Sequence, residues 1–332
     1  MQLPAPLPHP RSDHFDGSHF FNPGVDTDKT AADLLRWRRT GHRALWPAHR
    51  DNLPYPPAPS RIDAGEVAVT FIGHASALIR TADCTILVDP VFSERVSPIS
   101  FLGPKRIRPP GLSIDQLPPI DLVLLTHNHY DHMDLPSLRA LRTRPSPGGK
   151  RVPIVTGLGN GAYLARRGIA GAAELDWWQA IGLRPSVSIT FVPAQHWSSR
   201  SLSDRRQTLW GGFMIESGAS RIYVAGDSGY CGWFSEIRRR LGAPDVALLP
   251  IGAYEPRWFM QSQHMNPAEA VRAHQDLQAR HSIGMHFGTV QLTDEPIDEP
   301  LLALGQARAE AGLTSDDFTT LDVGETRVIP PR

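Results

Sequence analysis

The sequence has few cysteines, no net charge and no long apolar run. Its 332 residues include two cysteines without Cys-x-x-Cys spacing, so we expect a reducing compartment and no disulfide framework. Basic and acidic side chains both number 34, which argues against a nucleic-acid partner. No stretch approaches the ~20 apolar residues of a membrane span, and the N-terminus lacks the charged start and apolar centre of a signal peptide. These absences favour a cytoplasmic globular protein.

Residues 1–60 differ in composition from the remainder. They are rich in proline, histidine and arginine, and they contain one helix-like segment at 30–39 and the proline-dense stretch LPYPPAPS at 53–60. Such a segment cannot form the core of a sheet. We therefore predict an N-terminal extension, residues 1–60, that wraps a larger domain formed by residues 61–332.

From residue 66 onward, short apolar runs alternate with helix-like segments. The stretch 66–90 predicts two or three strands with a turn between them. Further strands are predicted at 120–126, 152–157, 172–178, 188–197, 210–217, 221–229, 245–252 and 282–288, and helices at 134–142, 160–168, 233–242 and 267–281. Short strands with helices between them indicate an α/β layered domain.

Ligand-type side chains crowd together directly behind one apolar run. The segment LLTHNHYDHMDLP, residues 124–136, contains His127, His129, Asp131 and His132. This spacing suits a loop between a strand and a helix, where two side chains can turn to one metal ion and two to a neighbouring ion. Imidazole together with carboxylate favours zinc, or another borderline divalent ion, over magnesium or calcium.

Three more donors follow other apolar runs in the same manner. They are His196 in ITFVPAQHW, Asp227 in RIYVAGDSGY and His286 in SIGMHFGT. Each one alone is as well explained as a hydrogen-bonded interior group. However, side chains at the ends of adjacent strands converge at one edge of an α/β fold. We therefore predict that all three join the first cluster.

These motifs resemble those of the metallo-β-lactamase superfamily. The resemblance is carried by THNHYDH, a later histidine, AGDSG and MHFG, and IGHASALI at 72–79 is similar to the first hairpin of that superfamily. A closer resemblance is to N-acyl-phosphatidylethanolamine-hydrolysing phospholipases D, through PAQHWSSR, WGGF, AGDSGYC and above all GAYEPRWFMQSQHMNPAEAV at 252–271. It covers roughly residues 30–300 and implies a four-layer αββα sandwich with two zinc ions per protomer.

The resemblance distributes the seven predicted ligands between the two zinc ions: His127, His129 and His196 on the first, Asp131, His132 and His286 on the second, and Asp227 bridging both. Two cations can neutralise the charge that develops on phosphodiester oxygens during cleavage. Asp131, Asp227 and His264 are the expected catalytic residues, and Asp131 is expected to orient the attacking group.

The substrate is expected to contact Gln263 and His264 in the loop SQHMN, although this loop also reads as the N-terminal cap of the helix at 267–281. Tyr130 lies between the predicted ligands and is a further substrate-contact candidate. His74, in IGHAS, is expected to pack behind the metal ligands.

The resemblance implies a zinc-dependent phosphodiesterase of phospholipase D type, which hydrolyses N-acylphosphatidylethanolamine-like lipids to N-acylethanolamine and phosphatidic acid. A lipid substrate implies peripheral contact with a membrane, with an apolar opening at Trp177-Trp178 and Trp258-Phe259, and a homodimer is compatible with this reading. Two alternatives stay open: a hydrolase of a lactone or small phosphodiester, and a non-catalytic metal-binding module. The seven-ligand set disfavours the module, because structural zinc sites normally close with four ligands.

Overall fold

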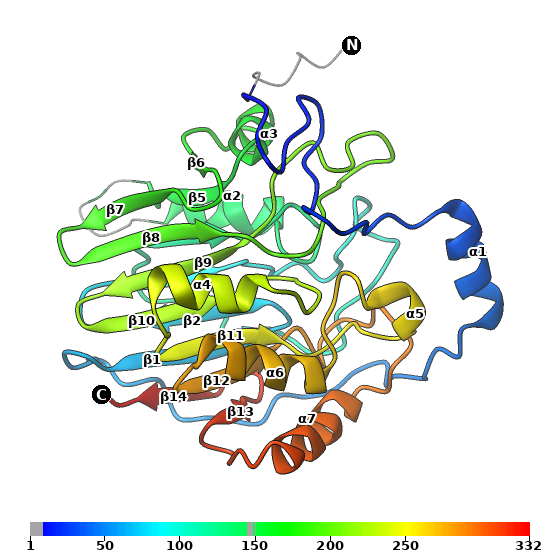
Figure 1. Ribbon diagram of the computed structural model, residues 1–332. Helices are drawn as coiled ribbons and strands as arrows, with labels where there is room; N and C mark the ends of the chain where they lie inside the picture. The colour runs from blue at the N-terminus through cyan, green and yellow to red at the C-terminus, as the bar shows by residue number, and fades with distance from the viewer. Residues whose placement is uncertain (1–8, 145–148, 150) are drawn as a thin grey trace.

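The computed structural model describes residues 9–144, 149 and 151–332, and two seven-stranded sheets form its centre (Figure 1). The first sheet contains β1 (Val67–Gly73), β2 (Ser76–Arg80), β3 (Thr85–Val88), β4 (Leu122–Leu125), β5 (Ile154–Gly157), β6 (Ala173–Leu175) and β14 (Thr326–Ile329). The second contains β7 (Ala180–Arg184), β8 (Val187–Val192), β9 (Gly212–Ser217), β10 (Ser220–Val224), β11 (Val246–Pro250), β12 (His281–Met285) and β13 (Phe318–Thr320).

Each sheet is antiparallel in one half and parallel in the other. The first has the order β14-β1-β2-β3-β4-β5-β6, and its strands run parallel from β3 to β6. The second has the order β13-β12-β11-β10-β9-β8-β7, and its strands run parallel from β10 to β13. Neighbouring parallel strands end at the same edge of a sheet, so the loops that follow them lie close together.

The central strands of the first sheet, β1 to β5, are buried on both faces. In β4, Leu122 and Leu124 belong to the core between the sheets, whereas Val123 and Leu125 pack with Leu138 in the layer outside the first sheet. Burial on both faces produces the continuous apolar run seen in the sequence, in place of an alternating pattern. A fully buried side chain of this kind stabilises the fold by about 1.5–3 kcal/mol.

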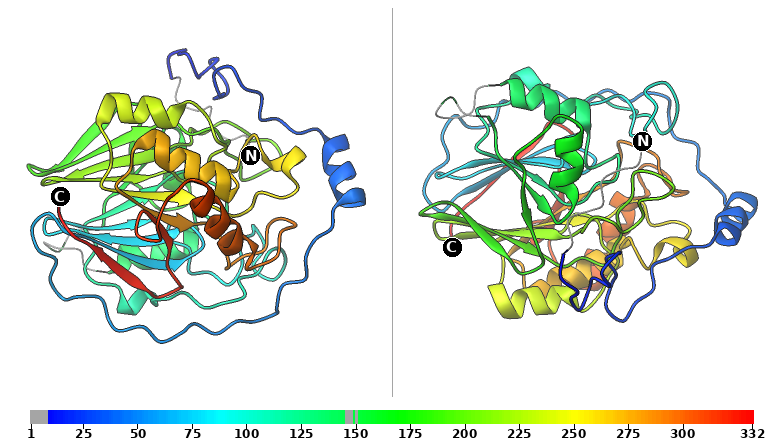
Figure 2. Two further views of the ribbon diagram at one scale, coloured as in Figure 1. Left: turned by 60° about the horizontal axis from the view of Figure 1, so that its bottom comes forward. Right: turned by 90° about the horizontal axis from the view of Figure 1, so that it is seen from above.

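Helices cover the outer face of each sheet. The helices are α1 (Ala31–Thr40), α2 (Leu135–Thr143), α3 (Asn160–Arg166), α4 (Trp233–Leu241), α5 (Arg257–Met260), α6 (Pro267–Leu277) and α7 (Glu299–Glu310), with a 3-10 turn η1 (Ile114–Gln116). Figure 2 shows α2 and α3 against the first sheet and α4, α6 and α7 against the second. The predicted αββα sandwich is confirmed.

Helix α6 is shorter than the sequence suggested. Its start agrees with the prediction, because Asn266 caps it and Glu269 closes a capping box. Its end does not: the helix stops at Leu277, and Gln278 takes a left-handed conformation with φ of 49°. The prediction that it continued to residue 281 was therefore wrong, since His281 already opens β12.

The described part of the N-terminal extension runs along the outside of the sandwich (Figure 2). Helix α1 buries none of its residues, and two tryptophans attach this segment to the body. The indole nitrogen of Trp37 donates to the Asp294 carboxylate at 2.9 Å, and that of Trp46 to the Glu295 carbonyl at 2.9 Å. The domain division at residue 60 stays a prediction. Across the described ranges, no helix has the length and apolarity that a membrane crossing needs.

Candidate metal centre

Loops from both sheets meet at one edge of the sandwich and carry the predicted metal ligands. The loop after β4 carries four of them, the loops after β8 and β10 carry one each, and the seventh is the residue directly after β12. All seven predicted ligands are at least partly shielded from solvent, and six are buried: His127, Asp131, His132, His196, Asp227 and His286, with His129 half-buried. The structure therefore brings together every ligand that the sequence suggested.

A glycine allows two of these loops to touch. Gly226, which precedes Asp227, has φ of +63°, and a Cβ added there would lie 2.8 Å from the Cβ of Thr126, which precedes His127. Any side chain at residue 226 would push the two loops apart. The close approach of the loops after β4 and β10 thus explains why glycine precedes Asp227 in AGDSG.

The first group of ligands consists of three imidazoles. The Nδ1 atom of His129 lies 2.9 Å from Nε2 of His127 and 3.2 Å from Nε2 of His196. Two nitrogens bound at about 2.0–2.1 Å to one tetrahedral zinc ion lie roughly 3.3 Å apart. The three rings are therefore spaced as ligands of a single ion.

The second group surrounds the Asp131 carboxylate. Its Oδ2 atom lies 3.3 Å from Nε2 of His286 and 3.6 Å from Nε2 of His132. His74 joins this group, because its Nε2 lies 2.9 Å from the same oxygen. His74 thus sits against the Asp131 carboxylate, and its backbone has a positive φ of 57°.

Asp227 lies between the two groups. Its Oδ2 is 3.1 Å from Nε2 of His132 and 3.2 Å from Nε2 of His286, on one side. On the other side it is 3.7 Å from Nε2 of His196 and 4.0 Å from Nε2 of His127. One carboxylate oxygen therefore faces both groups, which is the geometry that a bridging ligand requires.

Two imidazoles and two carboxylates of the cluster are held in metal-binding protonation states, whereas the carboxylates raise the pKa of His286 to about 9 against the effect of burial. Burial lowers the pKa of His129 and His196 to about 3. Burial alone would raise the pKa of Asp227 and Asp131, but the imidazole of His132 and its neighbours hold both carboxyl pKa values well below their ordinary range. Neutral imidazole and ionised carboxylate are the forms that coordinate metals. Burial would lower the pKa of His132, but the carboxylates of Asp227 and Asp131 raise this pKa well above its ordinary value. A metal ion that binds to His132 would therefore have to displace a proton.

The described side chains fit divalent metal ions. The ligand atoms of each group lie within 4.8 Å of one another. Oδ1 of Asp227 is buried without a hydrogen-bond partner, a costly state unless something else is bound nearby. The mixture of imidazole and carboxylate suits zinc or a similar ion. The cluster is thus capable of binding metal ions.

The loop before α6 reaches the same cluster. Nδ1 of His264 lies 3.9 Å from Oδ2 of Asp227, and its ring is 5.0 Å from that of His196. Gln263 is turned inward: its backbone carbonyl accepts a hydrogen bond from Nδ1 of His196 at 3.0 Å, and its side-chain oxygen accepts one from Trp197 at 2.6 Å. Tyr130 points elsewhere, and its hydroxyl donates to the carbonyl of Arg200.

Sequence reasoning missed a carboxylate that orients one ligand. Asp89, fully buried after β3, accepts a hydrogen bond from Nδ1 of His132 at 2.7 Å and from the hydroxyl of Thr126 at 2.6 Å. This contact fixes Nε2 of His132 toward the cluster. The signal was present, because Asp89 follows the apolar run TILV just as Asp227 follows another run.

It also missed a residue of the N-terminal extension. Asn22 is buried; its amide nitrogen donates to the carbonyl of His196 at 2.8 Å, and its oxygen accepts from the His196 backbone nitrogen at 3.2 Å. Nothing in the sequence links two residues that lie 174 positions apart. Asn22 holds the backbone of a predicted ligand from outside the sandwich.

Asn22→Ala is therefore expected to weaken metal binding. Partners that orient metal ligands typically contribute 10–100-fold in affinity, so a loss of about tenfold is expected, measured by competition with a chelator. Asn52→Ala is the matched control, since Asn52 also belongs to the extension and donates to a backbone carbonyl, that of Pro109. Equal metal affinity in a folded Asn22→Ala variant would show that the contact does not support His196.

Comparison with known proteins identifies relatives in sequence and in fold. The family described as "Beta-lactamase superfamily domain" matches residues 84–287. The chain is 38% identical to N-acyl-phosphatidylethanolamine-hydrolyzing phospholipase D 1 of Caenorhabditis elegans, over 77% of this chain and 74% of that protein. It is 31% identical to a UPF0173 metal-dependent hydrolase of Cupriavidus taiwanensis, over 80% of this chain and 90% of that protein. A solved metallo hydrolase from Ignicoccus hospitalis superposes with a TM-score of 0.58 at 22% identity, over 80% of this chain and 100% of that chain.

Proposed function

Given that the chain belongs to the beta-lactamase superfamily and is a metal-dependent hydrolase, we propose that it is a zinc-dependent phosphodiesterase of phospholipase D type. Its proposed substrates are N-acylphosphatidylethanolamine-like lipids, which it would cleave to N-acylethanolamine and phosphatidic acid. The proposed centre holds two zinc ions on the seven ligands described above. The similarity to the Caenorhabditis elegans phospholipase D supports this choice among hydrolases of the fold.

The observation that carries the proposal is the position of His264. It belongs to the segment 252–271, on which the resemblance to these phospholipases rests, and it lies against the ligand cluster. Its Nδ1 is buried without a hydrogen-bond partner. A polar group aimed at the cluster, beyond the seven ligands, is what binding of a substrate phosphate requires.

In the proposed reaction the side chains position water and the phosphodiester. Bound divalent ions would supply Lewis acidity, which lowers the pKa of water and offsets charge on the phosphoryl oxygens. Asp131, held by His74 at 2.9 Å, would accept a hydrogen bond from the attacking water and orient it. His264 would donate its N–H to a phosphodiester oxygen. No serine or cysteine nucleophile is needed.

Not all of the aromatic residues predicted to line the lipid opening are placed to do so. Trp177 is buried in the core, where its indole donates to the Trp210 carbonyl and stacks on His14, so the prediction that it lines an opening was wrong. Trp258 on α5 is 38% exposed, and Arg36 of α1 lies over its ring at 4.3 Å. Since α5 leads directly into the loop with His264, we place the opening and the membrane contact here.

Turnover of N-acylphosphatidylethanolamines is expected to rise with acyl length until the apolar surface of the proposed opening is covered. Each buried methylene contributes about 0.8 kcal/mol, or roughly fourfold in kcat/KM. The measurement is N-acylethanolamine release by mass spectrometry from lipids of graded acyl length, with a lactone and bis(p-nitrophenyl) phosphate alongside.

Trp258→Ala should flatten this dependence, whereas Leu302→Ala on α7, which removes another exposed apolar side chain, should leave it unchanged. Efficient turnover of the small esters with no gain from longer chains would contradict the lipid substrate and favour the lactone or small-phosphodiester alternative.

A further inference from the structure

A pocket lies on the outer side of the metal-binding loop. It has a volume of about 510 Å³ and is formed by the segment after β3, Tyr130, the start of α2, part of α3 and Arg200. Tyr130 is its only lining residue from the stretch 127–132. The seven predicted ligands therefore do not face it, and it is separate from the metal centre.

The pocket carries an excess of positive charge. Arg95, Arg139, Arg167 and Arg200 line it, and within the described ranges none of the four has a carboxylate oxygen within 4.0 Å. Its two carboxylates are already engaged with other groups. Glu94 pairs with Lys105 at 2.6 Å, and Asp134 accepts hydrogen bonds from the backbone nitrogens of Phe92 and Ser93 and from the hydroxyls of Ser93 and Ser137.

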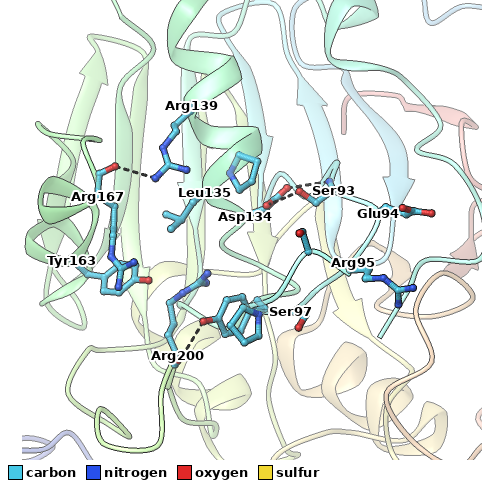
Figure 3. Close-up of a pocket in the computed structure, with 14 residues that line it drawn as sticks. Ser93, Glu94, Arg95, Ser97, Asp134, Leu135, Arg139, Tyr163, Arg167 and Arg200 are labelled. Carbon is cyan, nitrogen blue, oxygen red and sulfur yellow. Dashed lines mark hydrogen bonds between the residues drawn. The ribbon is translucent and has the colours of Figure 1, made fainter. Parts of the chain in front are cut away.

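Three of the arginines lie on one side of the pocket. Figure 3 shows Arg139, Arg167 and Arg200 on the side of the pocket that holds Tyr163, opposite Arg95. The guanidinium carbons of Arg167 and Arg200 lie 5.1 and 5.5 Å from the centroid of the Tyr163 ring, and Arg139 donates to the carbonyl of Arg167 at 3.2 Å. Guanidinium groups that line one pocket without a carboxylate partner favour the binding of an anion there.

The chemistry of the lining identifies the class of anion. A carboxylate is satisfied by one bidentate guanidinium, whereas several guanidinium groups suit the doubly charged, three-oxygen end of a phosphomonoester. The volume exceeds that of phosphate itself, and Tyr130, Leu135 and Pro136 supply apolar wall for an organic part. We propose that this pocket binds a phosphomonoester, with the phosphate at Arg139, Arg167 and Arg200.

Arg200 connects this site to the metal-binding loop. One of its terminal nitrogens, Nη1, donates to the carbonyls of Asn128 and Met133 at 2.8 and 2.7 Å, and its guanidinium stacks on Tyr130 at 3.8 Å. The other terminal nitrogen, Nη2, makes no hydrogen bond to a described residue and can reach a ligand. A phosphate there would fix the arginine that braces the loop from Asn128 to Met133.

The test is calorimetric titration of the metal-loaded protein with inorganic phosphate, sn-glycerol 3-phosphate and vesicles of phosphatidylcholine with phosphatidic acid. Phosphate can also bind at the metal centre, so the titrations are repeated on the double variant Arg139→Gln/Arg167→Gln. The binding phase that this variant weakens is the one that belongs to the pocket. Removal of one charge-assisted hydrogen bond lowers affinity about tenfold, so this phase should weaken at least tenfold in the double variant. Arg142→Gln/Arg166→Gln, which removes neighbouring arginines on the same two helices that do not line the pocket, should retain it.

The three probes distinguish the source of the phosphate. Binding of glycerol phosphate in this phase identifies a soluble phosphomonoester, and binding of the vesicles alone identifies a lipid headgroup. Identical titrations of the wild type and the double variant with all three probes would overturn the proposal. These titrations measure binding and not turnover, so they stand apart from the test of the phosphodiesterase.

Discussion

Asp227→Ala is expected to abolish hydrolysis and to lower the metal content by about one ion per chain. Oδ2 of Asp227 lies within 4.0 Å of imidazole nitrogens from both ligand groups, so its removal takes a ligand from each. Loss of one preorganised donor typically costs 10²–10³ in kcat, and loss of a bridging ligand should exceed this, at more than about a thousandfold. The measurements are N-acylethanolamine release and elemental analysis of the same sample.

Two further variants keep this experiment informative. Asp227→Asn preserves the shape of the side chain if the alanine variant does not fold, and it should also lose metal because an amide is a weaker ligand. Asp276→Ala removes a carboxylate that accepts from Tyr230 and serves as the matched control. An Asp227→Ala protein with full activity and unchanged metal content would rule out the bridging role.

His264→Ala is expected to lower kcat by about 10²–10³ while the metal content stays near that of the wild type. The reason is that His264 is proposed to contact the phosphodiester and not the ions. The geometry allows the opposite assignment, since His196, Asp227 and His264 also form a group of possible metal ligands. Kinetics and elemental analysis of one preparation separate the two roles.

A fall in metal content in His264→Ala would make His264 a metal ligand and remove the main support for its contact with substrate. His281→Ala is the matched control, because His281 lies at the start of β12 and its side chain, among the described residues, hydrogen-bonds to the carbonyl of Asp316 alone. Gln263→Ala should keep its metal as well, since the contact to His196 comes from the backbone carbonyl, which the substitution retains.

The sandwich could be predicted from the sequence because its central strands are buried on both faces. Runs such as LVLL in β4 and VALLP in β11 are unmistakably apolar. Strand β7 was missed, because its residues AIGLR are exposed and half-buried in alternation at the edge of the second sheet. Helix α7 and strands β13 and β14 were missed too, since they lie mostly beyond the part of the chain that carries the resemblance.

The residues of the candidate site could be predicted where a ligand directly follows an apolar run. They could not be predicted where the contact joins two residues that lie far apart in the sequence. His196 and Asp227 stand directly behind strands, so their convergence followed from the sheet. Asn22 and Arg200, which brace the ligand loops through backbone carbonyls, lie in polar segments that give no such signal. The end of α6 at the left-handed Gln278 could not be predicted either, because glycine or asparagine is the usual residue in that position.

The most direct test of the proposed dinuclear centre is the number of metal ions bound per folded chain. Protein purified without chelators and supplied with zinc should contain two divalent ions per chain by elemental analysis, and dialysis against a chelator should remove both the ions and the activity. One ion or none after zinc addition, in a protein that hydrolyses its substrate at full rate, would contradict the assignment of seven ligands to two metals.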